Sequence, residues 1–239
     1  MMKTILMLAL CIAASQAHPV FAQSNDENAL KKCLGEKMPR EDRLAACKIA
    51  AEEGQAIAQL MLGLMYANGE GVPENNAEAV KWYKRAAELG NDKAQFNLGY
   101  MYFNGMGVPE NNTEAVKWFR RAAEQGNAGA QFILGTMYAN GEGVPENNAE
   151  AVKWYRRAAE QGNAGAQLKL GLMYVIGKGV PEDYVQAFAW YNLSAAHGDE
   201  NASNSKDLLR KLMTPDQIER AQALSAELFR RIQSANNDE

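Results

Sequence analysis

Apolar residues recur at helical spacing through the middle of the chain, in short segments separated by glycine-rich turns. In one such segment they are Ala94, Leu98 and Tyr102, and the preceding Asn91 is a good helix N-cap. The segment ends at residues 104–109 (NGMGVP), where the glycines can adopt positive φ and the proline cannot continue a helix. The pattern predicts a first helix, which we call helix A.

A second amphipathic segment follows the turn. From about Asn112 it places Ala115, Trp118 and Ala122 on one face, and it stops at Gly126, a residue type favoured just past a helix end. This segment is predicted to form a second helix, helix B, antiparallel to helix A.

The helix pair repeats with a period of thirty-six residues. The stretch YANGEGVPENNAEAVKWY occurs at residues 66–83 and again at 138–155, two periods apart. Equivalent positions in the copies are Ala58, Ala94, Ala130 and Ala166; Gly63, Gly99, Gly135 and Gly171; and Trp82, Trp118, Trp154 and Trp190. A period of this length is typical of stacked repeats, so the doubled stretch is a structural unit rather than a site used twice.

Each copy keeps a glycine inside helix A, although an interior glycine costs about 1 kcal/mol relative to alanine. We expect this glycine to admit a neighbouring helix that a Cβ would block. One helix pair is too thin to bury its own apolar stripe, so the copies should stack on one another. The predicted fold class is therefore an all-α solenoid of stacked antiparallel helix pairs.

The repeated residues resemble a known family. The pattern A-x-x-x-L-G-x-x-Y-x-x-G-x-G-V, followed by A-x-x-W-x-x-x-A-A-x-x-G, is similar to the Sel1-like repeat, a relative of the tetratricopeptide repeat. The resemblance implies a right-handed superhelical scaffold that binds proteins, and it implies a link to envelope assembly, signalling or host contact for exported bacterial members.

The resemblance divides the chain into capping regions and four repeats. Within the C-terminal capping region, residues 202–239, one helix is marked by Leu208, Leu209 and Leu212, and Thr214 with Gln217 should form the capping box of another. The expected boundaries are 1–22 for a signal peptide, 23–57 for a degenerate helix pair, 58–93, 94–129, 130–165 and 166–201 for the repeats, and 202–239 for C-terminal capping helices.

Composition excludes some partners. The net charge is −4, and the 25 basic residues form no block, so the electrostatic footprint of a nucleic-acid-binding protein is missing. The acidic balance also argues against an anionic membrane surface as the partner.

The N-terminus has the layout of a secretory signal. Lys3 precedes an apolar stretch at residues 4–14, and Val20 and Ala22 are small residues at the positions before a cleavage site. Cleavage after Ala17 is a second possibility. The apolar stretch is shorter than the roughly 20 residues of a membrane span. The mature chain is expected to be exported, either periplasmic or secreted.

Cysteine parity predicts one disulfide. Cys11 would leave with the signal, so Cys33 and Cys47 remain as an even number in an exported chain. Two buried free thiols are the alternative. A zinc site is not expected, because His197, the one histidine of the mature chain, lies far along the sequence from both cysteines.

No set of residues predicts catalysis, a metal site or a cofactor. His197 is expected at a solvated helix end, and Ser203 to Lys206 match the S-x-x-K of serine β-lactamases without its companion motifs. The Gly-x-Gly turns lack the lysine and third glycine of phosphate loops. Cysteine-rich relatives of the family are associated with β-lactam binding or hydrolysis, and that activity is the alternative to a scaffold. Those relatives carry a cysteine pair in every repeat, whereas this chain carries one pair outside the four repeats.

Positions that vary between otherwise copied repeats indicate a recognition surface. They are spaced i, i+3 on helix A and would form one stripe. The resemblance places helix A on the concave side of the solenoid, so the stripe would floor a groove for a protein or peptide. The expected partner-binding residues are Met61, Leu64, Asn97, Tyr100, Phe103, Ile133, Thr136, Lys169 and Leu172, with Met61, Leu64, Tyr100, Phe103 and Ile133 exposed.

We predict that the exported protein begins at Gln23, because cleavage after Ala22 follows from the charged, apolar and small-residue regions in order. Intact-mass spectrometry of the mature protein checks this. A mass that retains Met1 or Met2 would contradict it.

Overall fold

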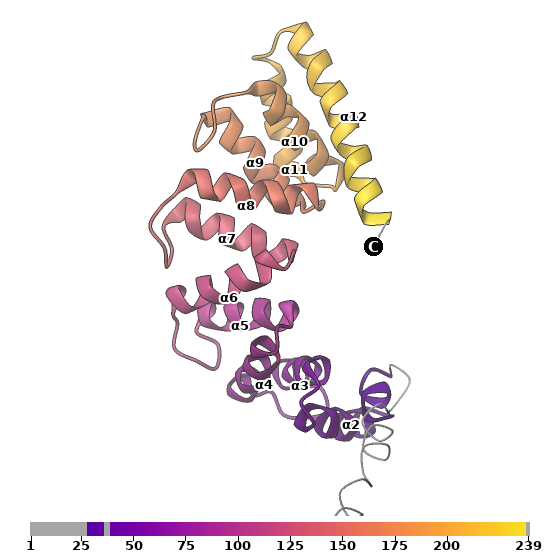
Figure 1. Cartoon of the computed structure of the whole chain (residues 1–239). Coiled ribbons are helices and arrows are strands. Elements are labelled where there is room, and N and C mark those ends of the chain that lie inside the picture. Colours follow the sequence, from indigo (N-terminus) through magenta and orange to yellow (C-terminus); the bar gives the residue numbers. More distant parts are fainter. Residues whose placement is uncertain (1–27, 36–38, 238–239) are drawn as a thin grey trace, which may run out of the picture. The chain divides into compact units, whose positions relative to one another are not determined.

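The computed structural model describes residues 28–35 and 39–237, and within them it contains helices and no strands. The expected signal peptide at residues 1–22 lies outside the described residues. The chain divides into two compact units at Leu89 and Gly90, which we call the N-terminal and C-terminal units. Each unit is described by itself below (Figure 1).

The helices follow the predicted alternation. In the N-terminal unit, residues 28–33 are helical and precede α2 (Arg40–Glu52), α3 (Ala56–Asn68) and α4 (Asn76–Glu88). The C-terminal unit contains α5 (Asp92–Asn104), α6 (Asn112–Glu124), α7 (Ala128–Asn140), α8 (Asn148–Glu160), α9 (Ala164–Ile176), α10 (Tyr184–Ala196), α11 (Glu200–Arg210) and α12 (Pro215–Asn237). Helix A of the four copies is α3, α5, α7 and α9, and helix B is α4, α6, α8 and α10.

Consecutive helix pairs stack. In the C-terminal unit α5 packs on α6, α7 on α8 and α9 on α10, and contacts between α6 and α7 and between α8 and α9 join the pairs (Figure 1). The all-α fold of stacked helix pairs is therefore confirmed.

Side-chain caps start the helices where the sequence predicts. The Asn127 side chain accepts a hydrogen bond from the backbone N–H of Ala130 at 2.9 Å, and Asn91 and Asn163 cap α5 and α9 in the same way. Helix B begins with the same chemistry, because Asn111 is the N-cap of α6. Each of these side chains satisfies a backbone N–H that has no partner within the helix.

The two glycines of the turn have different roles. Gly141 ends α7 with φ +71°, a left-handed conformation that glycine adopts without steric cost. Gly143 also has a positive φ, and a Cβ there would lie 2.3 Å from the carbonyl oxygen of Asn112 in the preceding copy. Gly179 makes the same approach to Asn148. The second glycine therefore lets the turn of one copy pass against the start of helix B of the copy before it.

The interior glycine of helix A admits an aromatic ring. A Cβ on Gly99 would lie 2.9 Å from the ring of Phe119, a fully buried side chain of α6 in the same copy. The other copies repeat the contact between Gly63 and Tyr83, Gly135 and Tyr155, and Gly171 and Tyr191. The expectation of a close helix approach at this glycine is confirmed, and the approaching group is the ring of helix B.

Buried glutamines join successive copies. Gln131 of α7 donates from Nε2 to the carbonyl oxygen of Ala123, near the end of α6, at 3.0 Å. Its Oε1 accepts a hydrogen bond from Gln161, just past α8, at 2.8 Å. The contact between Gln125 and Gln95 at 2.7 Å repeats the second bond one copy earlier. Since a buried amide is costly unless paired, these bonds favour one register between neighbouring pairs.

The disulfide between Cys33 and Cys47 is present. Both residues are fully buried, and their Cα atoms lie 4.5 Å apart. The bond links the helical residues 28–33 to α2. The chain-entropy estimate for a loop of this size is about 3 kcal/mol of stability.

The C-terminal helices also match their predicted signals. The backbone N–H of Thr214 donates to Gln217 Oε1 at 2.9 Å, and the N–H of Gln217 donates to Thr214 Oγ1 at 3.3 Å, which is the predicted capping box. From there α12 packs along α10 and reaches α8 (Figure 1). Its buried residues include Ala221, Leu228 and Ile232.

Replacing Gly99 with alanine tests the contact between this glycine and the ring of Phe119, because helix propensity and overpacking would change the melting temperature in opposite directions. Helix propensity alone would raise stability by about 1 kcal/mol. Overpacking against Phe119 typically costs about 1–3 kcal/mol, so we expect the melting temperature to fall.

The matched control is Gly99→Ala in a Phe119→Leu background, where the smaller side chain relieves the clash and the alanine should cost less. Thermal unfolding followed by circular dichroism measures all four proteins. A rise in melting temperature on Gly99→Ala alone would show that the ring does not constrain this position.

Candidate functional site

The residues considered for catalysis occupy structural positions. His197 is exposed at the C-terminal cap of α10. Lys206, the lysine of the S-x-x-K match, donates to Asn192 Oδ1 at 3.3 Å and so ties α11 to α10. Among the described residues, no group of histidine, cysteine and carboxylate side chains is arranged to hold a metal.

Three buried tyrosines and one glutamate of the repeats have pKa values that are shifted away from neutral pH. Burial raises the pKa of Tyr83 to about 12, and burial also raises the pKa of Tyr155 and of Tyr191. These phenols stay neutral beside the interior glycines. The pKa of Glu146 is lowered, first by the hydrogen bond from Asn148 and then by Lys178 at 3.2 Å. A general acid or base at neutral pH needs a pKa near 7, and these groups move away from it.

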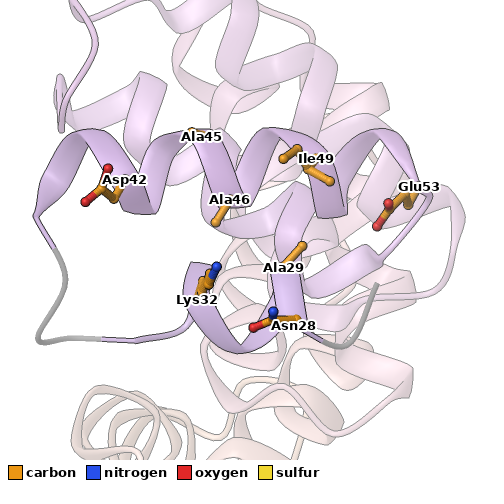
Figure 2. A pocket seen from close by; sticks show the side chains of 8 residues that line it. All are labelled: Asn28, Ala29, Lys32, Asp42, Ala45, Ala46, Ile49 and Glu53. Atoms are coloured by element: carbon orange, nitrogen blue, oxygen red, sulfur yellow. The ribbon is translucent and has the colours of Figure 1, made fainter. Parts of the chain in front are cut away.

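A depression of about 570 Å³ lies in the N-terminal unit between the helical residues 28–33 and α2. Figure 2 shows the small side chains of Ala29 and Ala46 between these two helices. Ala46 occupies the position that Trp82 and Trp118 hold in later copies, so a methyl group replaces an indole there. The residues that line the depression are Asn28, Ala29, Lys32, Asp42, Ala45, Ala46, Ile49 and Glu53. The side chains that line the depression show no arrangement for chemistry.

A stripe of positions on helix A is not buried in the C-terminal unit, and we call it the helix-A face. It consists of the same four positions on each of α5, α7 and α9, and of the four positions one period later, on and just past α11. The positions are Lys93, Asn97, Tyr100 and Asn104; Gly129, Ile133, Thr136 and Asn140; Gly165, Lys169, Leu172 and Ile176; and Asn201, Ser205, Leu208 and Leu212.

The expected partner-binding residues of this unit differ in exposure. Tyr100 is 45% exposed and Leu172 is 41% exposed, and Lys169 is exposed as well. Asn97 is half-buried. Thr136 is also half-buried, and its hydroxyl donates to the carbonyl oxygen of Phe132 at 3.1 Å and accepts from Tyr155 at 3.2 Å. The Thr136 hydroxyl is therefore engaged within the fold.

The expected exposure was wrong at four apolar positions. Phe103 and Ile133 are half-buried, because both pack on the core cluster that includes Phe119. In the N-terminal unit, Met61 packs on the cluster around the disulfide, and Leu64 is also half-buried. Sequence variation between copies showed that these positions tolerate change, but not how far a neighbouring helix covers them.

Three exposed apolar residues of the helix-A face were not anticipated as partner-binding residues. Ile176 is 53% exposed, Leu208 is 63% exposed and Leu212 is 68% exposed. Leu208 lies thirty-six residues after Leu172, and Leu212 lies thirty-six after Ile176. Continuing the repeat period into the C-terminal cap would have found them.

Comparisons with known proteins agree with the repeat analysis. The sequence model of the Sel1 repeat matches residues 56–91, 92–127, 128–163 and 164–199. Each matched copy begins at the first residue of a helix A, two residues before the boundary expected from the sequence. No curated protein sequence matches the chain at a significant level.

Two solved structures are similar over most of this chain. A Sel1 repeat protein from Oxalobacter formigenes is 35% identical with a TM-score of 0.70, over 88% of this chain and 85% of that chain. A protective antigen present in uropathogenic Escherichia coli strains, which displays an SLR fold, is 34% identical with a TM-score of 0.74. That match covers 87% of this chain but 44% of the antigen, so this chain spans less than half of that protein. Four matched repeats and these two structures show that the chain belongs to the Sel1 repeat family.

Proposed function

We propose that the chain is a non-enzymatic protein-interaction scaffold of the bacterial cell envelope, and that the helix-A face of the C-terminal unit binds a peptide or protein segment. Scaffolding and protein interaction are the common roles of Sel1 repeat proteins. The proposal assigns that role to one surface of this chain.

The observation that carries the proposal is the contrast between adjacent positions. Gly99 and its equivalents are invariant because a ring packs on each of them. Tyr100, the next residue, is replaced by Thr136 and then Leu172 in the following copies. Exposed tyrosine and leucine side chains that stacking does not need are suited to a partner, since exposed aromatic residues are common anchors at interfaces.

The envelope assignment rests on the disulfide and on the predicted signal. The bond between Cys33 and Cys47 fits an exported protein, because disulfides persist in oxidising compartments. In the part of the chain that the structure describes, no helix has both the length and the apolar character needed to cross a membrane.

Tyr100→Ala separates recognition from packing. Because Tyr100 is exposed, the melting temperature should stay close to that of the wild type. Loss of an aromatic anchor commonly costs about 2 kcal/mol, so the affinity for the partner should fall about 30-fold. Phe103→Ala is the matched control, because Phe103 packs on the core and its loss should lower the melting temperature.

The partner for this measurement can be trapped by photo-crosslinking in envelope extract. The benzophenone amino acid would replace Tyr100 or Leu172 on the helix-A face, or Lys153 on the exposed side of α8. We expect one adduct from the first two positions and none from Lys153. Adducts of equal yield at all three positions would place binding elsewhere.

The β-lactam alternative predicts turnover, whereas the scaffold predicts none. The mature chain should leave a chromogenic β-lactam unhydrolysed above the buffer rate. Hydrolysis that disappears in Ser203→Ala would replace the scaffold assignment by an enzymatic one. Ser205→Ala is the control, since Ser205 occupies one of the two variable positions of the S-x-x-K match.

A further inference from the structure

An apolar cluster occupies the end of the helix-A face nearest the C-terminus. It consists of Leu172 and Ile176 on α9 and Leu208 and Leu212, on and just past the end of α11, and we call it the aliphatic patch. Exposed fractions of its side chains range from 41% to 68%. Single exposed leucines are ordinary on protein surfaces, but four large aliphatic residues exposed on two segments that both pack on α10 form a candidate interaction site.

One buried side chain brings the two parts of the patch to the same side of the unit. The ring of Tyr191 in α10 packs against Gly171, where a Cβ would lie 2.7 Å away. The hydroxyl of the same tyrosine shares a hydrogen bond with Ser205 of α11. Leu172 follows Gly171 directly, and Leu208 lies one helical turn after Ser205. The terminal helix α12 packs along α10 and reaches α8, and it leaves these side chains exposed.

The patch departs from the pattern of the other copies. The position of Ile176 holds asparagine in each earlier copy, at Asn68, Asn104 and Asn140. Asn140 donates to Glu142 at 2.9 Å, whereas the fourth copy has Ile176 and Lys178 at these two positions. An exposed polar pair has thus been replaced by an aliphatic and a basic residue. Lys178 pairs with Glu146 at 3.2 Å, whereas Ile176 remains 53% exposed, so burial in the core does not explain the isoleucine.

The charge of the helix-A face indicates what covers the patch. The whole chain has a net charge of −4, yet the charged residues at the face positions are two lysines, Lys93 and Lys169, and no carboxylate. Lys169 lies one turn before Leu172, and Lys211 adjoins Leu212. Asp207 precedes Leu208, and both Asp207 and Lys211 lie outside the face positions. A second copy docked patch to patch would bring these lysines together, whereas an acidic partner would pair with them.

We propose that the aliphatic patch binds an acidic peptide segment of a partner protein, with leucine-like or aromatic side chains seated on the patch and carboxylates directed toward Lys169. This inference rests on the proposed function, because it names the chemistry of the partner at the same surface. In this arrangement the partner segment is anchored at the α9 and α11 end of the helix-A face, and Tyr100 contacts the same segment farther along.

Selection from a random peptide library displayed on phage tests the proposal with the mature chain as the target. The selected sequences should be enriched in Asp and Glu together with Leu, Ile or Phe. Leu208→Ser with Leu212→Ser should weaken a selected synthetic peptide about 10-fold or more, and Lys169→Glu should weaken it several-fold, with the difference shrinking at high salt. Phe229→Ser is the control, since Phe229 is 47% exposed on α12, outside the helix-A face, and its loss should change nothing.

The remaining outcomes separate this inference from the proposed function. If the selected peptides need Tyr100 but bind the double serine variant as well as the wild type, the helix-A face remains the binding surface and the role proposed for the aliphatic patch is wrong. Selected peptides that lack carboxylates would overturn the acidic partner. A wild-type dimer in sedimentation equilibrium that dissociates in the double serine variant would make a second copy the occupant. Peptides indifferent to Tyr100 and to the patch would overturn both proposals. Unchanged circular dichroism and melting temperature of the variants ensure that loss of binding is not loss of fold.

Discussion

The contact between an interior glycine of helix A and an aromatic ring of helix B is the constraint on which each repeat depends. Without a Cβ at Gly99, the ring of Phe119 lies directly against the backbone of α5 and becomes fully buried. Burying a phenylalanine side chain contributes roughly 1.5–3 kcal/mol, which offsets the cost of about 1 kcal/mol for a glycine inside a helix. The contact explains why every copy keeps both the glycine and an aromatic residue twenty positions later.

Polar contacts then determine how one pair sits on the next. Gln131 bonds both to the end of α6 in the preceding copy and to the residue after α8 in its own copy, so one side chain ties two copies together. Gly143 brings the turn of its copy against Asn112 of the copy before it. Because buried amides and close backbone approaches tolerate little displacement, these contacts favour a single stacking register. The near-identity of the copies is thus a requirement of packing.

The sequence predicted the elements well because their signals are local. Asparagine caps, turn glycines and the Thr214–Gln217 box each act over a few residues, and all were found where expected. The disulfide followed from cysteine parity. The burial of Phe103 and Ile133 was not predicted, because it depends on how far neighbouring helices cover a position. The buried glutamines were missed although Gln59, Gln95, Gln131 and Gln167 recur with the period of thirty-six, because a polar residue does not fit the amphipathic pattern from which the core was predicted.

The helix-A face was predicted in outline, and its most exposed part was not. Variation among α3, α5, α7 and α9 identified the stripe, but α11, which has Asp207 at the position of the interior glycine, was assigned to a cap. Its leucines nevertheless continue the period of thirty-six. Packing therefore accounts for what the copies share, while burial in the core does not explain exposed changes such as asparagine to Ile176. In a chain that stacks copies of one unit, departures at exposed positions are the residues available for recognition, and here they become most apolar at the end that α12 leaves uncovered.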